Sequence, residues 1–167
     1  LVPLVEIVAT EKTLAGLANA VAALLYSLGK CPVVLKNDIY GFIANRLQAA
    51  VLREACSLIE NDIADASQVD DAVKNGLAVR WILNGPFEIA DFGGLDIWNI
   101  VLNNLLPLLD SATEAPKIIQ EKVNRNELGL KTGKGFFNYD KKGMADAMLK
   151  RNRNLARVWA FLKGISR

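Results

Sequence analysis

Residues 41–60, GFIANRLQAAVLREACSLIE, have a helical pattern of apolar residues, and the rest of the chain is interpreted outward from this segment. Their apolar residues recur at helical spacing, namely Phe42, Ile43, Leu47, Ala50, Val51, Ala55, Leu58 and Ile59. The spacing predicts a helix from Phe42 to about Glu60, long enough to act as the central strut of a domain. Asn37, Asp38 and Gly41 precede this helix and predict a loop.

The stretch before this loop begins with a short apolar run, Leu4 to Val8, which is interrupted by Glu6. The run predicts a mostly buried strand. A buried carboxylate must be paired or hydrogen-bonded, so Glu6 is a candidate functional residue.

A helix and a second strand complete this first part of the chain. Apolar residues keep helical spacing from Leu14 to Leu28, where Thr13 is placed to cap the helix and Gly29 to end it in a left-handed conformation. Pro32 then opens a second strand over residues 33–35. Strand, helix and strand form the smallest unit of an α/β sheet, but this stretch is too short to form a whole sheet domain.

Only helices are predicted after the long helix. Ser67 and Asp70 form a capping pattern for a short helix through Val73 that ends at Gly76. Further helices are predicted over Pro86–Phe92, with Pro86 and Glu88 at its start, over Leu95–Leu106 and over Ala115–Asn126. No strand pattern recurs after residue 36, so the larger part of the chain is predicted to be all-α.

The composition excludes several chemistries. The chain contains no histidine, so a Ser-His-Asp triad, a histidine general base and histidine metal ligation cannot be built from its own residues. Cys31 and Cys56 do not form a CxxC pair, and we therefore predict no metal site and a reducing, cytoplasmic compartment. The longest uncharged run, Thr13 to Gly29, is shorter than the roughly 20 residues that span a bilayer, so no membrane segment is predicted.

Charge is distributed unevenly along the sequence. Residues 1–140 carry 12 Lys and Arg against 17 Asp and Glu, whereas residues 141–167 carry eight against one. This basic tail has apolar residues at Met148, Leu155, Trp159 and Leu162, a spacing that predicts an amphipathic helix covering a hydrophobic surface. We expect the tail to dock on the chain's own acidic body or on a partner subunit, in preference to nucleic acid or an anionic membrane.

The glycine and lysine cluster at residues 129–135 resembles a phosphate-binding loop but fails its spacing. Three residues separate Gly129 from Gly133 where a Walker loop has four, and Gly135 follows Lys134 where a Ser or Thr is needed. A GxGxxG dinucleotide fingerprint is also absent. The cluster predicts a flexible turn held by an aromatic anchor.

Asn45, near the start of the predicted long helix, is a second candidate functional residue. Asparagine is a mediocre helix former, and it is favoured at such a position when it caps the helix, packs against polar backbone or presents its amide to a ligand. The residues alone leave these three alternatives open.

Six segments occur in a particular order along the chain. They are LVEIV at 4–8, LGKCPVV at 28–34, GFIANRL at 41–47, GPFEIAD at 85–91, GGLD at 93–96 and KTGKGFF at 131–137. In this order, residues 1 to about 140 resemble the C-terminal half of the NAD-dependent L-3-hydroxyacyl-CoA dehydrogenases, which include the 3-hydroxybutyryl-CoA dehydrogenases. The tail from Lys141 onward lies outside the usual pattern of this family.

The resemblance implies a domain organisation. Residues 1–36 correspond to the terminal strand, helix and strand of an NAD-binding Rossmann domain. Residues 37–140 correspond to a helical substrate and dimerisation domain of the 6-phosphogluconate dehydrogenase-like type, and residues 141–167 form the basic helical tail. The sequence starts at Leu1 and its first methionine is Met144, so we expect further sequence upstream.

The resemblance also implies roles for individual residues. Glu6 matches the family's carboxylate, which fixes the tautomer of the catalytic histidine, and Asn45 matches an asparagine whose amide holds the substrate oxygen. Lys131 matches a lysine that contacts NAD, while Arg46, Gly85 and Pro86 are taken as structural. In the family the histidine precedes the segment that matches residue 1, so these 167 residues alone are expected to be inactive.

The expected activity is oxidation of an L-3-hydroxyacyl-CoA to the 3-oxoacyl-CoA with NAD, a step of fatty acid metabolism. The expected partners are the acyl-CoA substrate and a second copy in a homodimer, since strands around Leu4 and Val33 would expose edges and apolar faces. One alternative is a non-catalytic helical dimerisation module. Another is a dehydrogenase of a different 3-hydroxy acid, such as a sugar acid or carnitine.

Overall fold

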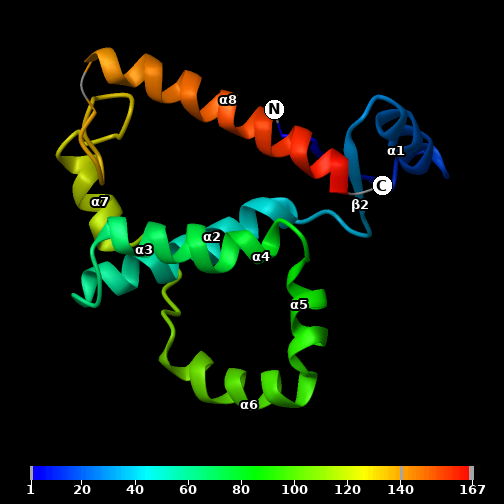
Figure 1. Ribbon diagram of the computed structural model, residues 1–167. Coiled ribbons are helices and arrows are strands. Elements are labelled where there is room, and N and C mark those ends of the chain that lie inside the picture. The colour runs from blue at the N-terminus through cyan, green and yellow to red at the C-terminus, as the bar shows by residue number, and fades with distance from the viewer. Residues whose placement is uncertain (1, 140, 166–167) are drawn as a thin grey trace. The chain divides into compact units, whose positions relative to one another are not determined.

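The computed structural model describes residues 2–139 and 141–165 and divides the chain into two compact units. The first unit consists of Leu1–Gln48 together with Gly129–Arg167, and the second is Ala49–Leu128. The long helix α2 (Phe42–Glu60), predicted from its spacing, runs from the first unit into the second (Figure 1). The chain is mainly helical with one small sheet, as the sequence predicted.

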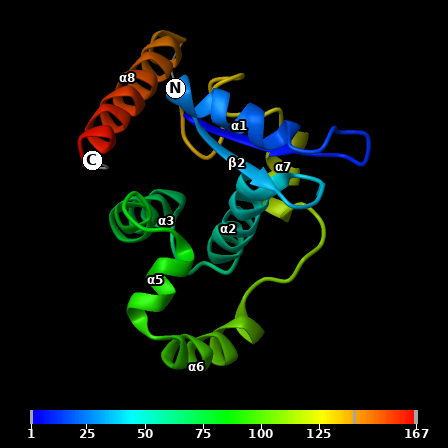
Figure 2. The ribbon, with the colours of Figure 1, turned by 90° about the vertical axis from the view of Figure 1, so that its right-hand side faces the viewer.

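That sheet is the predicted strand, helix and strand of the first unit. Strands β1 (Leu4–Val8) and β2 (Cys31–Leu35) pair in parallel, and helix α1 (Leu17–Ser27) connects them. Figure 2 shows α1 lying along the two strands. The register sets Glu6 opposite Val33. Outside β1 and β2, the described residues contain only isolated bridges, within the turn that follows Leu128.

Two details of this unit differ from the sequence prediction. Thr13 does not cap α1, because the helix begins only after Gly16, whose φ is 78°, and the Thr13 hydroxyl oxygen accepts the N–H of Thr10 at 2.9 Å. The second strand begins at Cys31, so Pro32 lies inside it. Gly29 ends the helical segment with a φ of 74°, as predicted.

In the second unit, the predicted short helix starts earlier and continues further. Helix α3 (Ala66–Ala72) is capped at Asp65, not Ser67, because the Asp65 N–H donates to the Gln68 side chain at 3.0 Å. Gly76 does not end it, since the chain continues as the π-helix η1 (Val73–Ala78) and the short helix α4 (Val79–Trp81). Gly76 therefore lies inside a continuous helical segment.

The remaining helices of this unit follow the prediction closely. They are α5 (Pro86–Gly93), α6 (Leu95–Leu105), the 3₁₀ turn η2 (Leu106–Leu108) and α7 (Lys117–Asn124). The Gly85 N–H donates to the Glu88 carboxylate at 2.9 Å, which confirms the predicted helix start around Pro86. Helices α5 and α6 contact each other where they meet, at a sharp corner (Figure 1).

Two glutamates of α2 accept hydrogen bonds from the backbone, one after η2 and one at the start of α7. The Glu54 carboxylate accepts the N–H of Asp110 at 2.9 Å, and the Glu60 carboxylate accepts the N–H of Ile118 at 2.7 Å. Cys56 lies on the same helix between Glu54 and Glu60, and its side chain is 1% exposed. Burial raises the pKa of the Cys56 thiol, and the charges of Glu60 and Asp110 raise it further.

The predicted helix of the basic tail is α8 (Lys141–Ile165), which belongs to the first unit. Leu155, Trp159 and Leu162 are half-buried, whereas Met148 is exposed. Within residues 2–139 and 141–165, no helix combines the length and apolar character needed to cross a membrane.

Candidate active site at the start of α2

Glu6 lies on β1 and contacts the first turn of α2. Its Oε1 accepts the N–H of Ile43 at 2.7 Å and the N–H of Ala44 at 3.3 Å. The first N–H groups of a helix have no partner within the helix and form the positive end of its dipole. A carboxylate there is favoured both by the hydrogen bonds it accepts and by its negative charge. The half-buried Glu6 therefore has the hydrogen bonds that the sequence argument required, supplied by backbone.

A tight turn brings those N–H groups toward β1. Gly41 has a φ of 84° and Phe42 a φ of 48°, so two consecutive residues adopt the left-handed conformation just before the helix continues. A Cβ at position 41 would lie 3.4 Å from the Cγ of Arg46 and 3.9 Å from the Cβ of Asn45. These are ordinary contact distances, so the positive φ, and not a lack of space, favours glycine at this position.

Asn45 directly follows Ala44, whose N–H is bound by Glu6. The Asn45 side chain is exposed, and no hydrogen bond to it is formed within the described part of the chain. The sequence left open whether this amide caps the helix, packs against backbone or serves a ligand; within the described residues it does neither of the first two, and the third stays a prediction. Neighbouring Arg46 instead contacts its own turn, since its Nη1 donates to the Tyr40 carbonyl at 3.4 Å.

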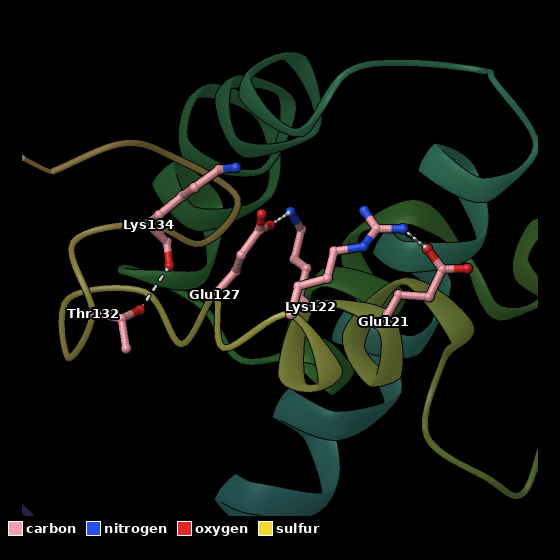
Figure 3. Close-up of polar contacts among 6 residues, drawn as sticks. Glu121, Lys122, Glu127, Thr132 and Lys134 are labelled. Atoms are coloured by element: carbon pink, nitrogen blue, oxygen red, sulfur yellow. Dashed lines mark hydrogen bonds and ion pairs between the residues drawn. The ribbon is translucent and has the colours of Figure 1, made fainter.

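Lys131 lies in the glycine-rich turn of residues 129–139. Bridges between Gly129 and Lys134 and between Lys134 and Asn138 hold the turn, and the Thr132 hydroxyl donates to the Lys134 carbonyl at 3.2 Å (Figure 3). Lys131 itself is exposed and forms no ion pair among the described residues. The described contacts bring Glu6 to the first turn of α2, but they do not join Lys131 to Glu6 or Asn45.

An ion pair at the end of α7 was not foreseen from the sequence. Lys122 Nζ lies 3.4 Å from the Glu127 carboxylate, and the two side chains are 21% and 14% exposed (Figure 3). Arg125 and Glu121 form a second pair at 3.0 Å, on the surface. The first pair joins residues that are not at a regular helical spacing, so no periodicity argument could have found it.

The described residues offer no metal site. In residues 2–139 and 141–165, no three His, Cys, Asp or Glu side chains are grouped so that they could hold a metal ion. The contacts of Glu6 that the sequence analysis missed are those with the N–H groups of Ile43 and Ala44, because a backbone donor leaves no signal in a side-chain motif.

The family assignment follows from a sequence match. Residues 41–139 match the C-terminal domain of 3-hydroxyacyl-CoA dehydrogenases. The chain belongs to this family, and residues 41–139 correspond to that C-terminal domain.

Similar proteins differ in what they act on. The chain is 32% identical over 164 residues, 98% of its length, to the 5-formyl-3-hydroxy-2-methylpyridine 4-carboxylate 5-dehydrogenase of Mesorhizobium japonicum, of which it covers 53%. It is 34% identical over 145 residues, 83% of its length, to the mitochondrial hydroxyacyl-coenzyme A dehydrogenase of Sus scrofa, of which it covers 44%. The chain thus spans about half the length of these relatives.

A solved structure of a similar enzyme has the same fold. It is a 5-formyl-3-hydroxy-2-methylpyridine 4-carboxylic acid 5-dehydrogenase, described as an NAD⁺-dependent dismutase. The two share 32% sequence identity with a TM-score of 0.93, over 98% of this chain and 53% of that one. The similarity therefore extends through α8, which lies beyond the family match.

Proposed function

We propose that this chain forms the helical domain and part of the active site of an NAD-dependent dehydrogenase that oxidises an L-3-hydroxyacyl-CoA to the 3-oxoacyl-CoA. In such a reaction the C3–H bond breaks with transfer of hydride, and the proton of the 3-hydroxyl passes to a general base. NAD, when bound, accepts the hydride. The chain has no histidine, so the base is supplied from outside these 167 residues, which on their own are inactive.

The contact between Glu6 and α2 carries this proposal. Both hydrogen bonds from α2 go to Oε1, and Oε2 accepts none within the described part of the chain. Oε2 is therefore available to accept an N–H from an imidazole, which would fix its tautomer and stabilise its protonated form. The same carboxylate holds the turn that carries Asn45, so base and amide are positioned together.

Asn45 and Lys131 have side chains suited to the other two roles. The Asn45 amide can donate to the substrate oxygen as its charge changes during the reaction. The exposed Lys131 ammonium can contact the phosphates of NAD, which fits an unpaired cation on a tight backbone turn. It is the one cofactor contact we assign to this chain, because the sequence contains no dinucleotide fingerprint.

NADH formation from 3-hydroxybutyryl-CoA tests the proposal. A protein that joins this chain to a dinucleotide-binding domain should turn over, whereas the 167 residues alone should not. We expect N45A to lower kcat by about 100-fold, the cost of losing one oxyanion donor, without a change in unfolding temperature. N37A, at another exposed asparagine, is the control. Equal rates for N45A and N37A, or turnover by the isolated chain at ordinary enzyme rates, would contradict the assignment.

A second candidate substrate is a formylated pyridine carboxylate. The match to the Mesorhizobium enzyme favours it, because that match includes α8 and covers 98% of the chain. The roles of Glu6, Asn45 and Lys131 are unchanged, since the amide would contact the oxygen of a different substrate. The ratio of kcat/KM for the CoA thioester and the pyridine substrate decides between the two. Absence of turnover with both would favour a non-catalytic dimerisation module.

We also propose that the protein is a cytoplasmic homodimer and that residues 1–36, 37–140 and 141–167 act as the three functional parts. Both cysteines are free thiols, which supports a reducing compartment. Large apolar side chains are exposed in both units, which supports self-association. Light scattering at micromolar concentration tests the dimer, and a monomer would contradict it.

A further inference from the structure

Phe42, the first residue of α2, has a backbone conformation that aromatic residues rarely adopt. Its φ of 48° follows the φ of 84° at Gly41, so the left-handed conformation that glycine adopts freely is continued by a residue with a bulky side chain. Such a conformation costs free energy and persists only where the surrounding contacts hold it. The contacts on either side of Phe42 therefore have to keep the chain in this conformation.

On the helix side, the Glu6 carboxylate binds the N–H groups that follow Phe42. On the other side, the Phe42 N–H donates to the Ile39 carbonyl at 3.1 Å and closes a four-residue turn over residues 39–42. Gly41 is the third residue of this turn, and a positive φ at that position is the requirement of a type II turn. The orientation of the peptide between the second and third residues distinguishes a type II turn from a type I turn.

Arg46 binds this central peptide, which joins Tyr40 to Gly41. The Arg46 Nη1 donates to the Tyr40 carbonyl oxygen at 3.4 Å. Within residues 2–139 and 141–165, Arg46 forms no ion pair and no other hydrogen bond. The guanidinium therefore fixes the orientation of a backbone peptide, and it does not neutralise a carboxylate of the described chain.

The side chains of Arg46 and Asn45 both begin next to this turn. A Cβ on Gly41 would lie 3.4 Å from the Cγ of Arg46 and 3.9 Å from the Cβ of Asn45. At these contact distances, the backbone of the turn is part of the surface against which the Asn45 side chain rotates. A rotated peptide between Tyr40 and Gly41 would change that surface and, with it, the direction in which the Asn45 amide points.

We propose that Arg46 is a positioning residue, which holds the turn of residues 39–42 and thereby orients the Asn45 amide. Glu6 holds the same strained segment from the helix side, so the two side chains act on either side of Phe42. The inference rests on the proposed function, in which the Asn45 amide contacts the substrate oxygen. Arg46 acts through Asn45 and makes no contact with the substrate itself.

R46M and R46K separate the hydrogen bond from the packing. Both keep the aliphatic stem beside Gly41, but only lysine can donate to the Tyr40 carbonyl. In the protein that joins this chain to a dinucleotide-binding domain, R46M should lower kcat by about fivefold or more with the KM for the substrate within about twofold, because a misplaced amide affects the rate more than binding. R46K should keep kcat within about twofold.

R80M is the matched control for R46M. Arg80 is also exposed, and its Nε donates to the Gly76 carbonyl at 3.2 Å within its own helical segment. R80M should leave kcat unchanged. If R46M does not fold, R46K still tests the hydrogen bond, since a kcat lowered by about fivefold or more in R46K contradicts the inference by itself.

The N45A background tests whether Arg46 acts through Asn45. In N45A, R46M should lower kcat by less than about twofold further, because the amide that Arg46 orients is absent. An equal loss of kcat from R46M in both backgrounds would overturn the inference. A raised KM with an unchanged kcat in R46M would also overturn it, since Arg46 would then bind the substrate directly.

Amide hydrogen exchange tests the turn without any need for turnover. The Phe42 N–H, which is bonded to the Ile39 carbonyl, should exchange faster in R46M than in R80M, while circular dichroism reports whether both variants keep their helices. Equal exchange at Phe42 in the two variants contradicts the inference whatever the activity. An unchanged kcat in N45A instead contradicts the proposed function, because it removes the role of Asn45, and the exchange at Phe42 then decides separately whether Arg46 holds the turn.

Discussion

Removal of the Glu6 carboxylate should destabilise the first turn of α2 and, with it, the position of Asn45. The carboxylate accepts two backbone N–H groups, from Ile43 at 2.7 Å and from Ala44 at 3.3 Å. A hydrogen bond to a charged group contributes about 1.5 to 3 kcal/mol, and a charge at a helix N-terminus about 0.3 to 1 kcal/mol. Only the 2.7 Å contact with Ile43 has the length of a strong hydrogen bond, and Glu6 is only half-buried. We therefore use the lower part of both energy ranges.

E6A should therefore lower the free energy of unfolding by about 2 kcal/mol, which corresponds to roughly 4 to 8 °C in Tm for a chain of this size. E6Q keeps an oxygen that can accept the Ile43 N–H but loses the charge, so we expect about half of that effect. E11A and E11Q are matched controls, since Glu11 is exposed and has no partner among the described residues. Thermal unfolding followed by circular dichroism measures all four.

Amide hydrogen exchange gives a local measurement of the same contact. The amides of Ile43 and Ala44 should exchange faster in E6A than in E11A, while amides in the middle of α2 should change less. In the active enzyme, E6Q should also lower kcat, because the amide that replaces the carboxylate cannot carry the charge that stabilises an imidazolium. The reasoning fails if E6A and E11A have the same Tm and the same exchange at Ile43 and Ala44.

Four further predictions concern backbone and thiol chemistry. G133A should destabilise the glycine-rich turn by about 1 to 2 kcal/mol, because φ is 79° there and a Cβ would lie 3.0 Å from the Tyr139 carbonyl oxygen; urea unfolding measures this, and no loss of stability would contradict it. G76A should instead stabilise by about 0.5 to 1 kcal/mol, since this helical position has open space around it; a lower urea midpoint than in the unmodified protein would refute this. A thiol reagent should label the exposed Cys31 quickly and the buried Cys56 only on unfolding. Because the pKa of Cys56 is raised in the folded protein, the thiol of the unfolded chain loses its proton at lower pH than the folded one. The contribution of the protonated thiol to the free energy of unfolding is therefore complete below the pKa of the unfolded thiol and declines above about pH 9. A C56A variant should lose this decline in stability, and an unchanged alkaline decline in C56A would contradict the prediction.

The elements that the sequence predicted well are those defined by local periodicity. Helix α2 begins and ends where its apolar spacing indicated, and β1 has the predicted bounds. Pro86 and Glu88 mark the start of α5 because the signal lies within one turn of chain. Such patterns are local, so they do not depend on the rest of the fold.

The errors concern the residues at which helices start and end. Asp65 and Ser67 are both good capping residues, and the structure uses Asp65 because Gln68 is then three residues away. Thr13 precedes a helical pattern, but the hydroxyl bonds back to Thr10 and the helix starts later. Gly76 was expected to stop a helix, yet a π-helical turn carries the chain through it.

The sequence by itself determined the mainly helical class, the family through six ordered segments, and the identity of the candidate residues Glu6, Asn45 and Lys131. The tertiary structure alone decided that Glu6 binds the backbone of Ile43 and Ala44, which are far from it along the chain. It also decided that the amide of Asn45 is exposed. The physical reason is that periodicity reports which residues share one helix or strand, whereas backbone hydrogen bonds and exposed faces depend on how separate elements pack together.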